Sequence, residues 1–337
     1  RQILNGELKV VIGARSALFL PFKNLSLIVV DEEHDASYKQ EDGVIYNARD
    51  MAVVRGRFSN SKVILASATP SLESIYNAKI GKYHKILLSK RYGSAEMPKI
   101  NLVDMQKEKL PSNKWIAQES INAIKKALDN NEQVLLYINR RGYSPLTLCR
   151  SCGHRFSCPN CSSWLVNHKK TNKLLCHHCG YQEKIPDECP SCNSKEELVP
   201  CGPGVERLAA EAKSLFPSAR LEIIASDTLN SNDKAENIFK TISNGEVDII
   251  VGTQLIAKGH NFLNLTTVVA VDADLGLSGG DLRASERTFQ MLTQLAGRAG
   301  RAGKPATVYF QTYNSNQSII NQITNPDPFI FLENELK

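Results

Sequence analysis

Much of the architecture follows from one stretch of sequence, Cys149-Arg-Ser-Cys152-Gly-His-Arg-Phe-Ser-Cys158-Pro-Asn-Cys161. This stretch holds two of the four CxxC pairs of the chain. The other two pairs follow closely, at Cys176/Cys179 and Cys189/Cys192. A CxxC pair places two thiolates where both can bind one tetrahedral Zn²⁺, and two pairs complete a four-sulfur site. Eight cysteines therefore predict two zinc ions. The spacing alone leaves open which pairs share a metal.

Disulfide bonds are the alternative use of these cysteines. Nothing in the sequence indicates secretion, and the Gly or Pro that follows several of the cysteines is typical of zinc ribbons, so metal binding is favoured. Cys201 lacks a CxxC partner and is expected to be a core or incidental residue. Eight thiolates already fill eight ligand positions, so no ligand role is expected for the neighbouring histidines His154, His168, His177 and His178.

Length and composition set broad limits. A chain of 337 residues, 42% hydrophobic and 7% aromatic, is typical of a soluble protein of about two domains. No apolar run approaches the roughly 20 residues of a membrane helix and no signal peptide opens the sequence, so we expect a cytoplasmic protein without a membrane partner. Each four-thiolate zinc site carries a charge of −2, so two sites lower the formal charge of +6 to +2. Net charge is therefore weak evidence for nucleic-acid binding.

Apolar runs and helical stretches alternate along the chain. Before about residue 91, strands are predicted at residues 9–12, 25–30 and 62–66, with a helix near 47–57. Residues 92–113 contain Gly93, Pro98 and Pro111 and are expected to form a linker. Because the chain starts at Arg1 and meets an apolar run almost at once, we expect it to begin inside a domain.

A second α/β pattern follows the linker and is interrupted by the cysteines. Its predicted elements are helices near 116–128, 205–216 and 285–296 and strands near 133–138, 220–224, 247–251, 266–271 and 306–310. Fully apolar strands bounded by polar turns indicate a parallel sheet covered on both faces. The sequence therefore predicts two α/β lobes with a zinc module inserted in the second.

Acidic residues follow the apolar run at 27–30. Asp31 and Glu32 would lie at the carboxyl end of a parallel strand, where α/β sheets bind ligands. Asp31 could hold Mg²⁺ while Glu32 orients an attacking water. A solvated acidic turn is the alternative. The next strand ends in Ser67-Ala68-Thr69-Pro70, which would place small hydroxyls at the same edge of the sheet.

Two arginines stand three residues apart near the end of the last predicted helix. In Gln294-Leu-Ala-Gly-Arg298-Ala-Gly-Arg301, both guanidiniums could point to one side and offset charge on a γ-phosphate. A basic helix face is the alternative, but it usually comes with acidic partners and not with glycines. Between these motifs, Gly252-Thr253-Gln254 and Lys258-Gly259-His260 predict a loop that grips phosphates.

In this order the four segments resemble motifs II, III, V and VI of the superfamily 2 helicases. With four CxxC pairs inside the second lobe, the chain resembles the primosomal protein N′ family of replication restart helicases. The likeness extends from the first residue to about Tyr313. Further stretches that carry it are 13–17, 37–40 with 46–49, 139–143, 201–206, 272–274 and 283–287.

The resemblance implies two RecA-like lobes, the first incomplete. On this basis we expect the end of lobe 1 and a linker at 1–112, the start of lobe 2 at 113–147, a zinc-binding insertion at 148–194, the rest of lobe 2 at 195–313 and the start of a C-terminal domain at 314–337. In the family the outer CxxC pairs share one zinc and the inner pairs the other. Carried over, Cys149, Cys152, Cys189 and Cys192 would bind one ion, and Cys158, Cys161, Cys176 and Cys179 the second.

The resemblance also implies an ATP-dependent 3′ to 5′ DNA helicase that recognises stalled forks and reloads the replicative helicase. Its cofactors would be two zinc ions and Mg²⁺, with ATP as substrate. Its partners would be branched and single-stranded DNA, other primosome proteins and single-stranded DNA-binding protein, and it would act at the nucleoid.

Site residues carry over position by position. The expected catalytic residues are Asp31, Glu32, Arg298 and Arg301. Those expected near ATP and Mg²⁺ are Glu33, His34, Ser67, Thr69, Gly259 and Gln294. Those expected to contact DNA are Arg15, Tyr38, Lys39, Tyr46, Arg49, Arg140, Arg141, Thr253 and Lys258. Aromatic faces stack on any base and cations follow phosphates, but tyrosines that only pack the loop onto the lobe are the alternative.

Two features depart from the family pattern. Asn261 stands where the family commonly has an acid, which puts a nucleotide contact of that carboxylate in doubt. The chain also contains no GxxxxGK[ST] sequence, so we expect the phosphate-binding loop to lie upstream of Arg1 and the chain by itself to be inactive.

A non-catalytic zinc-bearing module that binds DNA or partners is the second hypothesis. An in-frame phosphate-loop sequence upstream of Arg1 would favour the first hypothesis.

Overall fold

The computed structural model describes residues 1–88, 96–111, 113–139, 146–161, 163–168, 173–195, 197–201, 204–225, 232–253, 256, 262–277, 281–301, 303–325 and 329–336. The chain divides into two compact units, residues 1–86 with 332–337, and residues 87–331. Among the described residues, no helix combines the length and the apolar character needed to cross a membrane.

The first unit is built on two parallel strands, β1 (Leu27–Val30) and β4 (Lys62–Leu65), paired from Leu27 opposite Lys62 to Val30 opposite Leu65. The crossover helix α2 (Ala48–Phe58) packs on both strands. Gly56 allows this close approach, because a Cβ at that position would collide with Val63. The other elements are α1 (Gln2–Asn5), the 3-10 helices η1 (Arg15–Phe19) and η2 (Ala36–Tyr38), the short antiparallel strands β2 (Lys39–Gln40) and β3 (Tyr46–Asn47), and α3 (Leu72–Lys79).

One predicted strand is wrong. Residues 9–12 form no strand, and the side chains of Val10 and Ile12 are 79% and 96% exposed. An apolar run becomes a strand only where a neighbouring strand accepts and donates its backbone hydrogen bonds. The predictions for β1, α2 and β4 are confirmed, with ends that shift by up to two residues.

The second unit centres on a six-stranded sheet in which every pair is parallel, in the order β12-β13-β6-β14-β15-β5. Its strands are β5 (Lys99–Asp104), β6 (Gln133–Tyr137), β12 (Leu221–Ile224), β13 (Ile249–Gly252), β14 (Leu265–Ala270) and β15 (Thr307–Thr312). Strands β6, β13 and β14 are buried along their whole length, as parallel strands covered on both faces must be.

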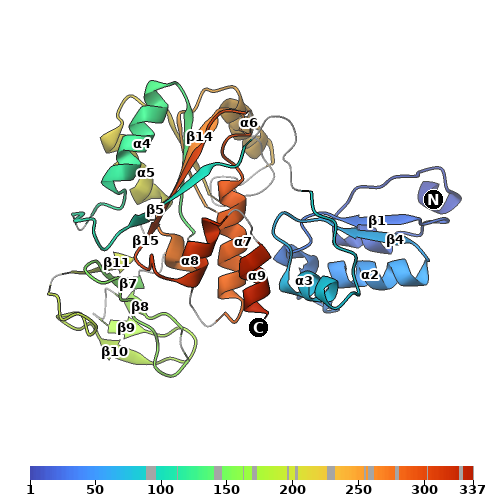
Figure 1. Ribbon diagram of the computed structural model, residues 1–337, viewed down its shortest axis with the longest axis horizontal. Coiled ribbons are helices and arrows are strands. Elements are labelled where there is room, and N and C mark those ends of the chain that lie inside the picture. The colour runs from blue at the N-terminus through green and yellow to red at the C-terminus, as the bar shows by residue number, and fades with distance from the viewer. Residues whose placement is uncertain are drawn as a thin grey trace. The chain divides into compact units, whose positions relative to one another are not determined.

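Helices cover both faces of this sheet (Figure 1). On one face Val134 and Leu136 of β6 pack with Ile124 of α4 (Gln118–Asp129) and Leu208 of α5 (Val205–Leu215). On the other face, Tyr137 contacts Met291 of α7 (Ala284–Ala296). The remaining elements are α6 (Asn232–Ser243), the 3-10 helix η4 (Ala273–Gly276), α8 (Ser318–Ile323) and α9 (Phe329–Glu335).

The expected linker needs a correction. Residues 99–104 form β5, the edge strand of the six-stranded sheet, paired with β15 from Lys99 opposite Thr307 to Asp104 opposite Thr312. Because an edge strand pairs on one side only and stays half-exposed, β5 lacks the continuous apolar run by which the buried strands were predicted.

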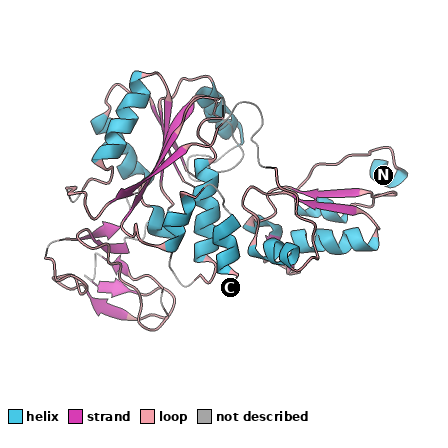
Figure 2. Ribbon diagram, viewed as in Figure 1, coloured by secondary structure: helices cyan, strands magenta, loops and turns pink. Residues whose placement is uncertain are grey.

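A cysteine-rich module lies between β6 and α5. Its antiparallel sheet has the order β10-β9-β8-β7-β11, with β7 (Leu146–Cys149), β8 (Val166–His168), β9 (Lys173–Leu175), β10 (Gln182–Lys184) and β11 (Leu198–Cys201). Figure 2 shows this module as strands and loops. The predicted α/β class and the insertion of a zinc-ribbon module in the second unit are thereby confirmed.

Candidate functional site

The acidic motif of the first unit lies where the sequence predicts it. Asp31, Glu32, Glu33 and His34 directly follow β1, and Ser67 and Thr69 follow the neighbouring parallel strand β4. The backbone N–H of Glu33 donates to the carbonyl of Ala66 at 3.0 Å and so extends the pairing of the two strands. Both motifs therefore meet at one edge of the sheet, the edge at which α/β proteins bind ligands.

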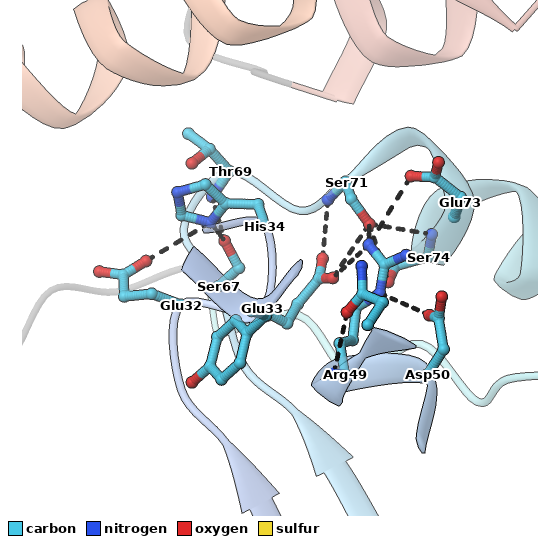
Figure 3. A network of polar contacts seen from close by, with 12 residues as sticks. Glu32, Glu33, His34, Arg49, Asp50, Ser67, Thr69, Ser71, Glu73 and Ser74 are labelled. Atoms are coloured by element: carbon cyan, nitrogen blue, oxygen red, sulfur yellow. Dashed lines mark hydrogen bonds and ion pairs between the residues drawn. The ribbon is translucent and has the colours of Figure 1, made fainter. Parts of the chain in front are cut away.

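A histidine joins the two motifs. His34 Nδ1 lies 2.7 Å from Ser67 Oγ, which also accepts the backbone N–H of Thr69 at 2.9 Å (Figure 3). The same His34 nitrogen lies 3.6 Å from a carboxylate oxygen of Glu32. The His34 ring therefore links the motif after β1 to the motif after β4.

Asp31 and Glu32 are exposed, and Glu32 has an unusual backbone conformation. Its φ of 48° lies in the left-handed region, which L residues with a long side chain seldom adopt. Such conformations cost free energy and cluster at active sites, where surrounding contacts maintain them. Exposed carboxylate oxygens at a strand end fit Mg²⁺, which prefers oxygen ligands and keeps several waters.

Glu33 faces the interior of the first unit. It is 1% exposed, and its carboxylate accepts the backbone N–H of Ser71 at 2.7 Å and the Ser71 hydroxyl at 2.9 Å. In Figure 3 it points away from Glu32, toward Ser71 and Arg49. These bonds anchor the loop after β4 to the segment after β1, which indicates a structural role for Glu33 and not direct contact with ATP or Mg²⁺.

Arg49 is also placed inside this unit, which does not fit the expected DNA contact. It is 7% exposed, and its guanidinium donates to Ser71 Oγ at 2.7 Å, to Asp50 at 2.8 Å and to Glu33 at 3.4 Å. Burial lowers the pKa of Arg49, but its hydrogen bond to Asp50 and the negative charges of Asp50, Glu33 and Glu73 outweigh this effect and raise the pKa above its usual value. Sequence pattern could not reveal this, because an arginine beside acidic residues looks the same whether buried or exposed.

The loop between β1 and α2 carries the other candidate DNA contacts. Tyr38 is half-buried and donates its hydroxyl to the backbone carbonyl of Asp31 at 2.7 Å. Arg15 donates to the carbonyl of Lys39 at 2.7 Å, and the exposed Lys39 ammonium lies 3.1 Å from Glu41. Tyr46 packs edge-on against Phe19 with ring centroids 5.4 Å apart. Both tyrosines thus contact other residues of the first unit.

In the second unit, Arg298 and Arg301 lie in the turn after α7 and not on the helix itself. Arg298 is 8% exposed, whereas Arg301 is exposed, with its Nε 3.2 Å from the carbonyl of Gly297. Gly300 has a φ of 73°, and a Cβ there would lie 2.9 Å from that of Ala306. The turn separates the environments of the two arginines, although the sequence pattern predicts that both can point to one side.

The structure describes some of the other expected site residues and leaves others outside its described ranges. Gln294 is half-buried on α7, and Thr253 follows β13, where its N–H donates to Ile224 at 3.3 Å. Four predicted residues lie outside the described part of the chain: Arg140, Arg141, Lys258 and Gly259.

The eight cysteines form two groups of four. The outer cluster is Cys149, Cys152, Cys189 and Cys192, and the inner cluster is Cys158, Cys161, Cys176 and Cys179. Within each cluster all sulfur atoms lie within 4.8 Å of one another. This is the nested arrangement that the family resemblance implies.

The sulfur distances fit zinc. Four sulfurs about 2.3 Å from a tetrahedral Zn²⁺ are about 3.8 Å apart. In the outer cluster the Cys149–Cys192 and Cys152–Cys189 sulfurs are 3.7 Å apart, and in the inner cluster the Cys158–Cys179 and Cys161–Cys176 sulfurs are 3.4 Å apart. These distances are far longer than the roughly 2.05 Å of a disulfide. The donor set and its geometry thus suit two structural zinc ions.

All four knuckles share one backbone design. The N–H of the first cysteine donates to the carbonyl five residues later, from Cys149 to His154, Cys158 to Ser163, Cys176 to Tyr181 and Cys189 to Ser194. The residue after the second cysteine takes positive φ at Gly153, Gly180 and Asn193. Backbone and side-chain hydrogen bonds from Ser163 lower the pKa of Cys161 to about 5, and those of the Ser194 hydroxyl and backbone lower the pKa of Cys192 to about 6. Such donors favour the thiolate at Cys161 and Cys192, whereas burial raises the pKa of the Cys152 thiol to about 12.

Family models match two parts of the chain. Residues 158–184 match the PriA DNA helicase Cys-rich region (CRR) domain, and residues 192–303 match the helicase conserved C-terminal domain. The first match covers the inner cluster, and the second covers strands β12, β13 and β14 of the six-stranded sheet with helices α5, α6 and α7.

Curated relatives match over nearly all of the chain. Replication restart protein PriA of Rickettsia felis is 53% identical over 337 residues, which is 100% of this chain and 52% of the relative. PriA of Bacillus subtilis is 39% identical over 100% of this chain and 42% of the relative, and PriA of Haemophilus influenzae is 41% identical over 95% and 43%. The chain thus spans about half the length of the curated relatives it matches.

Solved structures resemble the chain more distantly. RecG bound to a three-way DNA junction aligns with a TM-score of 0.48 and 16% identity over 94% of this chain and 30% of that one. Dbp5 of S. cerevisiae bound to RNA and ADP BeF3 aligns with a TM-score of 0.45 and 12% identity, over 93% and 63%.

Proposed function

Since the chain is a relative of replication restart protein PriA and contains that family's cysteine-rich region, we propose that it supplies part of the motor of an ATP-dependent 3′ to 5′ DNA helicase. The substrates proposed are ATP and branched DNA forks with single-stranded DNA. The proposed protein partners are other primosome proteins and single-stranded DNA-binding protein, at the nucleoid in the cytoplasm.

The observation that carries the proposal is the contact between His34 and Ser67. It joins the acidic motif after β1 to the hydroxyl motif after β4 at 2.7 Å, and it leaves the Asp31 and Glu32 side chains exposed at the same edge. A solvated acidic turn, the alternative interpretation, needs no such link. The arrangement instead favours two motifs that respond to one bound nucleotide.

The roles of the residues follow from their charge and placement. Asp31 would hold Mg²⁺, which neutralises charge on the phosphates when bound. Glu32 would accept a hydrogen bond from the attacking water and orient it toward the γ-phosphate. In the second unit, exposed Arg301 offers a guanidinium that can stabilise charge developing on the phosphoryl group. Thr253, Arg15, Tyr38, Lys39 and Tyr46 are proposed DNA contacts, together with the undescribed Arg140, Arg141 and Lys258.

The test uses the full-length protein with a forked DNA that has a 3′ single-stranded arm. Glu32→Gln should lower the DNA-stimulated kcat for ATP by a factor on the order of 10² or more and abolish unwinding, because the amide cannot orient and deprotonate water. Glu7→Gln, at an exposed position of the same unit, should retain both activities.

Three outcomes count against the proposal or part of it. Normal ATP hydrolysis by Glu32→Gln removes the catalytic role of this residue. A full-length protein that binds forks with no ATP hydrolysis at all supports the second hypothesis, a non-catalytic DNA-binding module. Preference for 5′ arms over 3′ arms would reverse the proposed polarity.

A further inference from the structure

The two cysteine clusters differ in what surrounds them. The inner cluster packs into a small core of the cysteine-rich module itself, with Phe156, Leu165 and Leu174 buried beside its sulfurs. One knuckle of the outer cluster, Cys149–Cys152, instead contains and is followed by residues that reach into the six-stranded lobe. Three contacts of the knuckle Cys149–Cys152 and the residues after it establish this difference.

The first contact is made by Arg150, which lies between two outer-cluster cysteines. Its guanidinium donates to the backbone carbonyl of Leu110 at 2.8 Å, of Pro111 at 2.5 Å and of Lys114 at 2.6 Å. These carbonyls belong to the β5–α4 connector, whose described residues are 105–111 and 113–117. One side chain of the knuckle therefore donates to three backbone carbonyls of the connector, of which that of Pro111 also accepts the N–H of Lys114 at 3.0 Å.

The second contact is backbone packing at Gly153, directly after Cys152. With φ at 77°, Gly153 lies so close to Tyr313, at the end of β15, that a Cβ would be 2.7 Å from the Tyr313 Cβ. Gln106 of the connector joins the knuckle to Tyr313, since its Nε2 donates to the carbonyls of Cys152 at 3.3 Å and Tyr313 at 2.5 Å. The knuckle, the connector and the end of β15 thus share one junction.

The third contact is an ion pair. Arg155 Nη2 lies 2.7 Å from Asp272 and 3.6 Å from Asp274, all with buried side chains. Asp272 accepts the N–H of Asp274 at 3.2 Å and caps η4, while Asp274 accepts the Thr312 hydroxyl at 2.6 Å and the Tyr313 N–H at 2.7 Å. Arg155 is therefore the cation that holds two buried carboxylates at the carboxyl end of β14.

The lobe holds the connector from its other side. Glu211 of α5 accepts the N–H groups of Trp115 at 2.9 Å and Ile116 at 3.3 Å, and Gln311 of β15 accepts that of Ala117 at 2.9 Å. Helix α4 begins directly after these residues, and its N-cap Ala117 offers no side-chain cap. The start of α4 therefore depends on side chains from elsewhere, and the connector depends on Arg150 for its carbonyls.

We propose that the metal of the outer cluster positions the helicase lobe, while the metal of the inner cluster does not. A knuckle adopts its fold because thiolates converge on a metal, and this fold aims Arg150 at the connector and Arg155 at η4. Arg150 and Arg155 are then positioning residues. Because linkage is reciprocal, an ordered connector and η4 also strengthen metal binding at the outer cluster.

The main test compares two matched variants of the zinc-loaded protein by amide hydrogen exchange. Cys192→Ser and Cys179→Ser each remove the exposed second cysteine of a knuckle, one from each cluster, and each should lose one zinc. We expect Cys192→Ser to raise exchange about tenfold or more at the N–H groups of Trp115, Ala117 and Tyr313. Cys179→Ser should leave these amides within about twofold of the parent protein. Equal effects of the two variants, or none in Cys192→Ser, would overturn the proposal.

A second pair of variants keeps every cysteine. Lysine has one compact ammonium and cannot reach three carbonyls or replace a guanidinium fork. Arg150→Lys should therefore raise exchange at Trp115 and Ala117, and Arg155→Lys at Asp274 and Tyr313, with both zincs still present. Arg207→Lys, at an exposed position on α5, is the control and should change neither region.

The reciprocal measurement is release of zinc to a chelator. In Arg150→Lys and Arg155→Lys, we expect one of the two zinc ions to be released several-fold faster than from the parent protein, as a fast phase of release. When Cys192→Ser is added to either variant, the outer zinc is already lost and this fast phase should disappear. A fast phase that persists in the Cys192→Ser background, or unchanged exchange and release in both lysine variants, refutes the positioning role.

Discussion

The hydroxyl of Tyr38 donates a 2.7 Å hydrogen bond to the backbone carbonyl of Asp31. One side chain of the loop between β1 and α2 is thereby attached to the residue proposed to hold Mg²⁺. Burial, followed by the negative charges of Asp31, Asp35 and Glu32, raises the pKa of Tyr38, so the phenol stays protonated and remains a donor. A displacement of this ring by DNA would move the Asp31 backbone directly.

Two variants of Tyr38 separate stacking from this hydrogen bond. In the full-length protein, Tyr38→Ala with Tyr46→Ala should reduce DNA stimulation of ATP hydrolysis far more than the basal rate, because stacking supplies the signal and not the chemistry. Tyr38→Phe keeps the ring and loses only the bond to Asp31. We expect it to retain DNA affinity and lose part of the stimulation. Equal loss of basal and stimulated rates in the double variant would show that the loop is only structural.

Arg49→Ala should destabilise the protein by about 3 kcal/mol or more, because it leaves the buried Glu33 carboxylate without its cation. Denaturant unfolding monitored by a probe in the first unit measures the change. Arg57→Ala, at an exposed position on the same helix, is the control and should stay within about 0.5 kcal/mol. A loss of DNA affinity by Arg49→Ala at unchanged stability would restore the expected DNA contact.

Arg301→Ala in the full-length protein should lower kcat for ATP by a factor on the order of 10² or more and leave nucleotide affinity comparatively intact. Arg298→Ala should have a similar or milder effect on kcat. Because Arg298 is 8% exposed, its removal should in addition lower stability, which thermal unfolding measures. An Arg301→Ala enzyme that turns over normally, or that fails only by losing ATP affinity, would remove this role.

The protein should bind two zinc ions, because each cluster offers four thiolates at distances that suit a tetrahedral ion. Elemental analysis after reducing, metal-replete purification measures the number. Cys149→Ser combined with Cys192→Ser should remove one ion and leave the other. Loss of both ions, or of neither, contradicts the nested pairing.

Burial and the neighbouring Asp272 charge raise the pKa of Asp274 to about 6, from an ordinary value of 3.8. Between pH 3.8 and about 6, Asp274 is protonated in the folded protein and ionised in the unfolded chain. Its contribution to the free energy of unfolding is therefore largest below pH 3.8 and is lost as pH rises through 6. Carbon-13 NMR of the carboxyl should show the raised titration. Asp248, whose pKa is lowered by its hydrogen bond from Arg220, is the internal control. A titration of Asp274 at its ordinary value would contradict this assignment.

The sequence by itself determined the elements with strong local signals. The buried strands β6, β13 and β14 were predicted because continuous apolar runs leave little alternative to a covered parallel sheet. The cysteine clusters were predicted to be metal sites because CxxC spacing is a local geometric property. Their nested pairing came from family resemblance, and the structure places the sulfurs in that arrangement.

Tertiary structure alone decided which charged side chains are buried. Nothing in the local sequence separates Arg49 from Arg301 by burial, yet Arg49 is enclosed by Glu33 and Asp50 and Arg301 is exposed. Arg150 and Arg155 were not predicted to have a role, because their partners are backbone carbonyls and carboxylates that lie 36 to 119 residues away in the sequence. Whether a charge is paired depends on desolvation and on groups brought together from distant segments, and no local pattern encodes either of these.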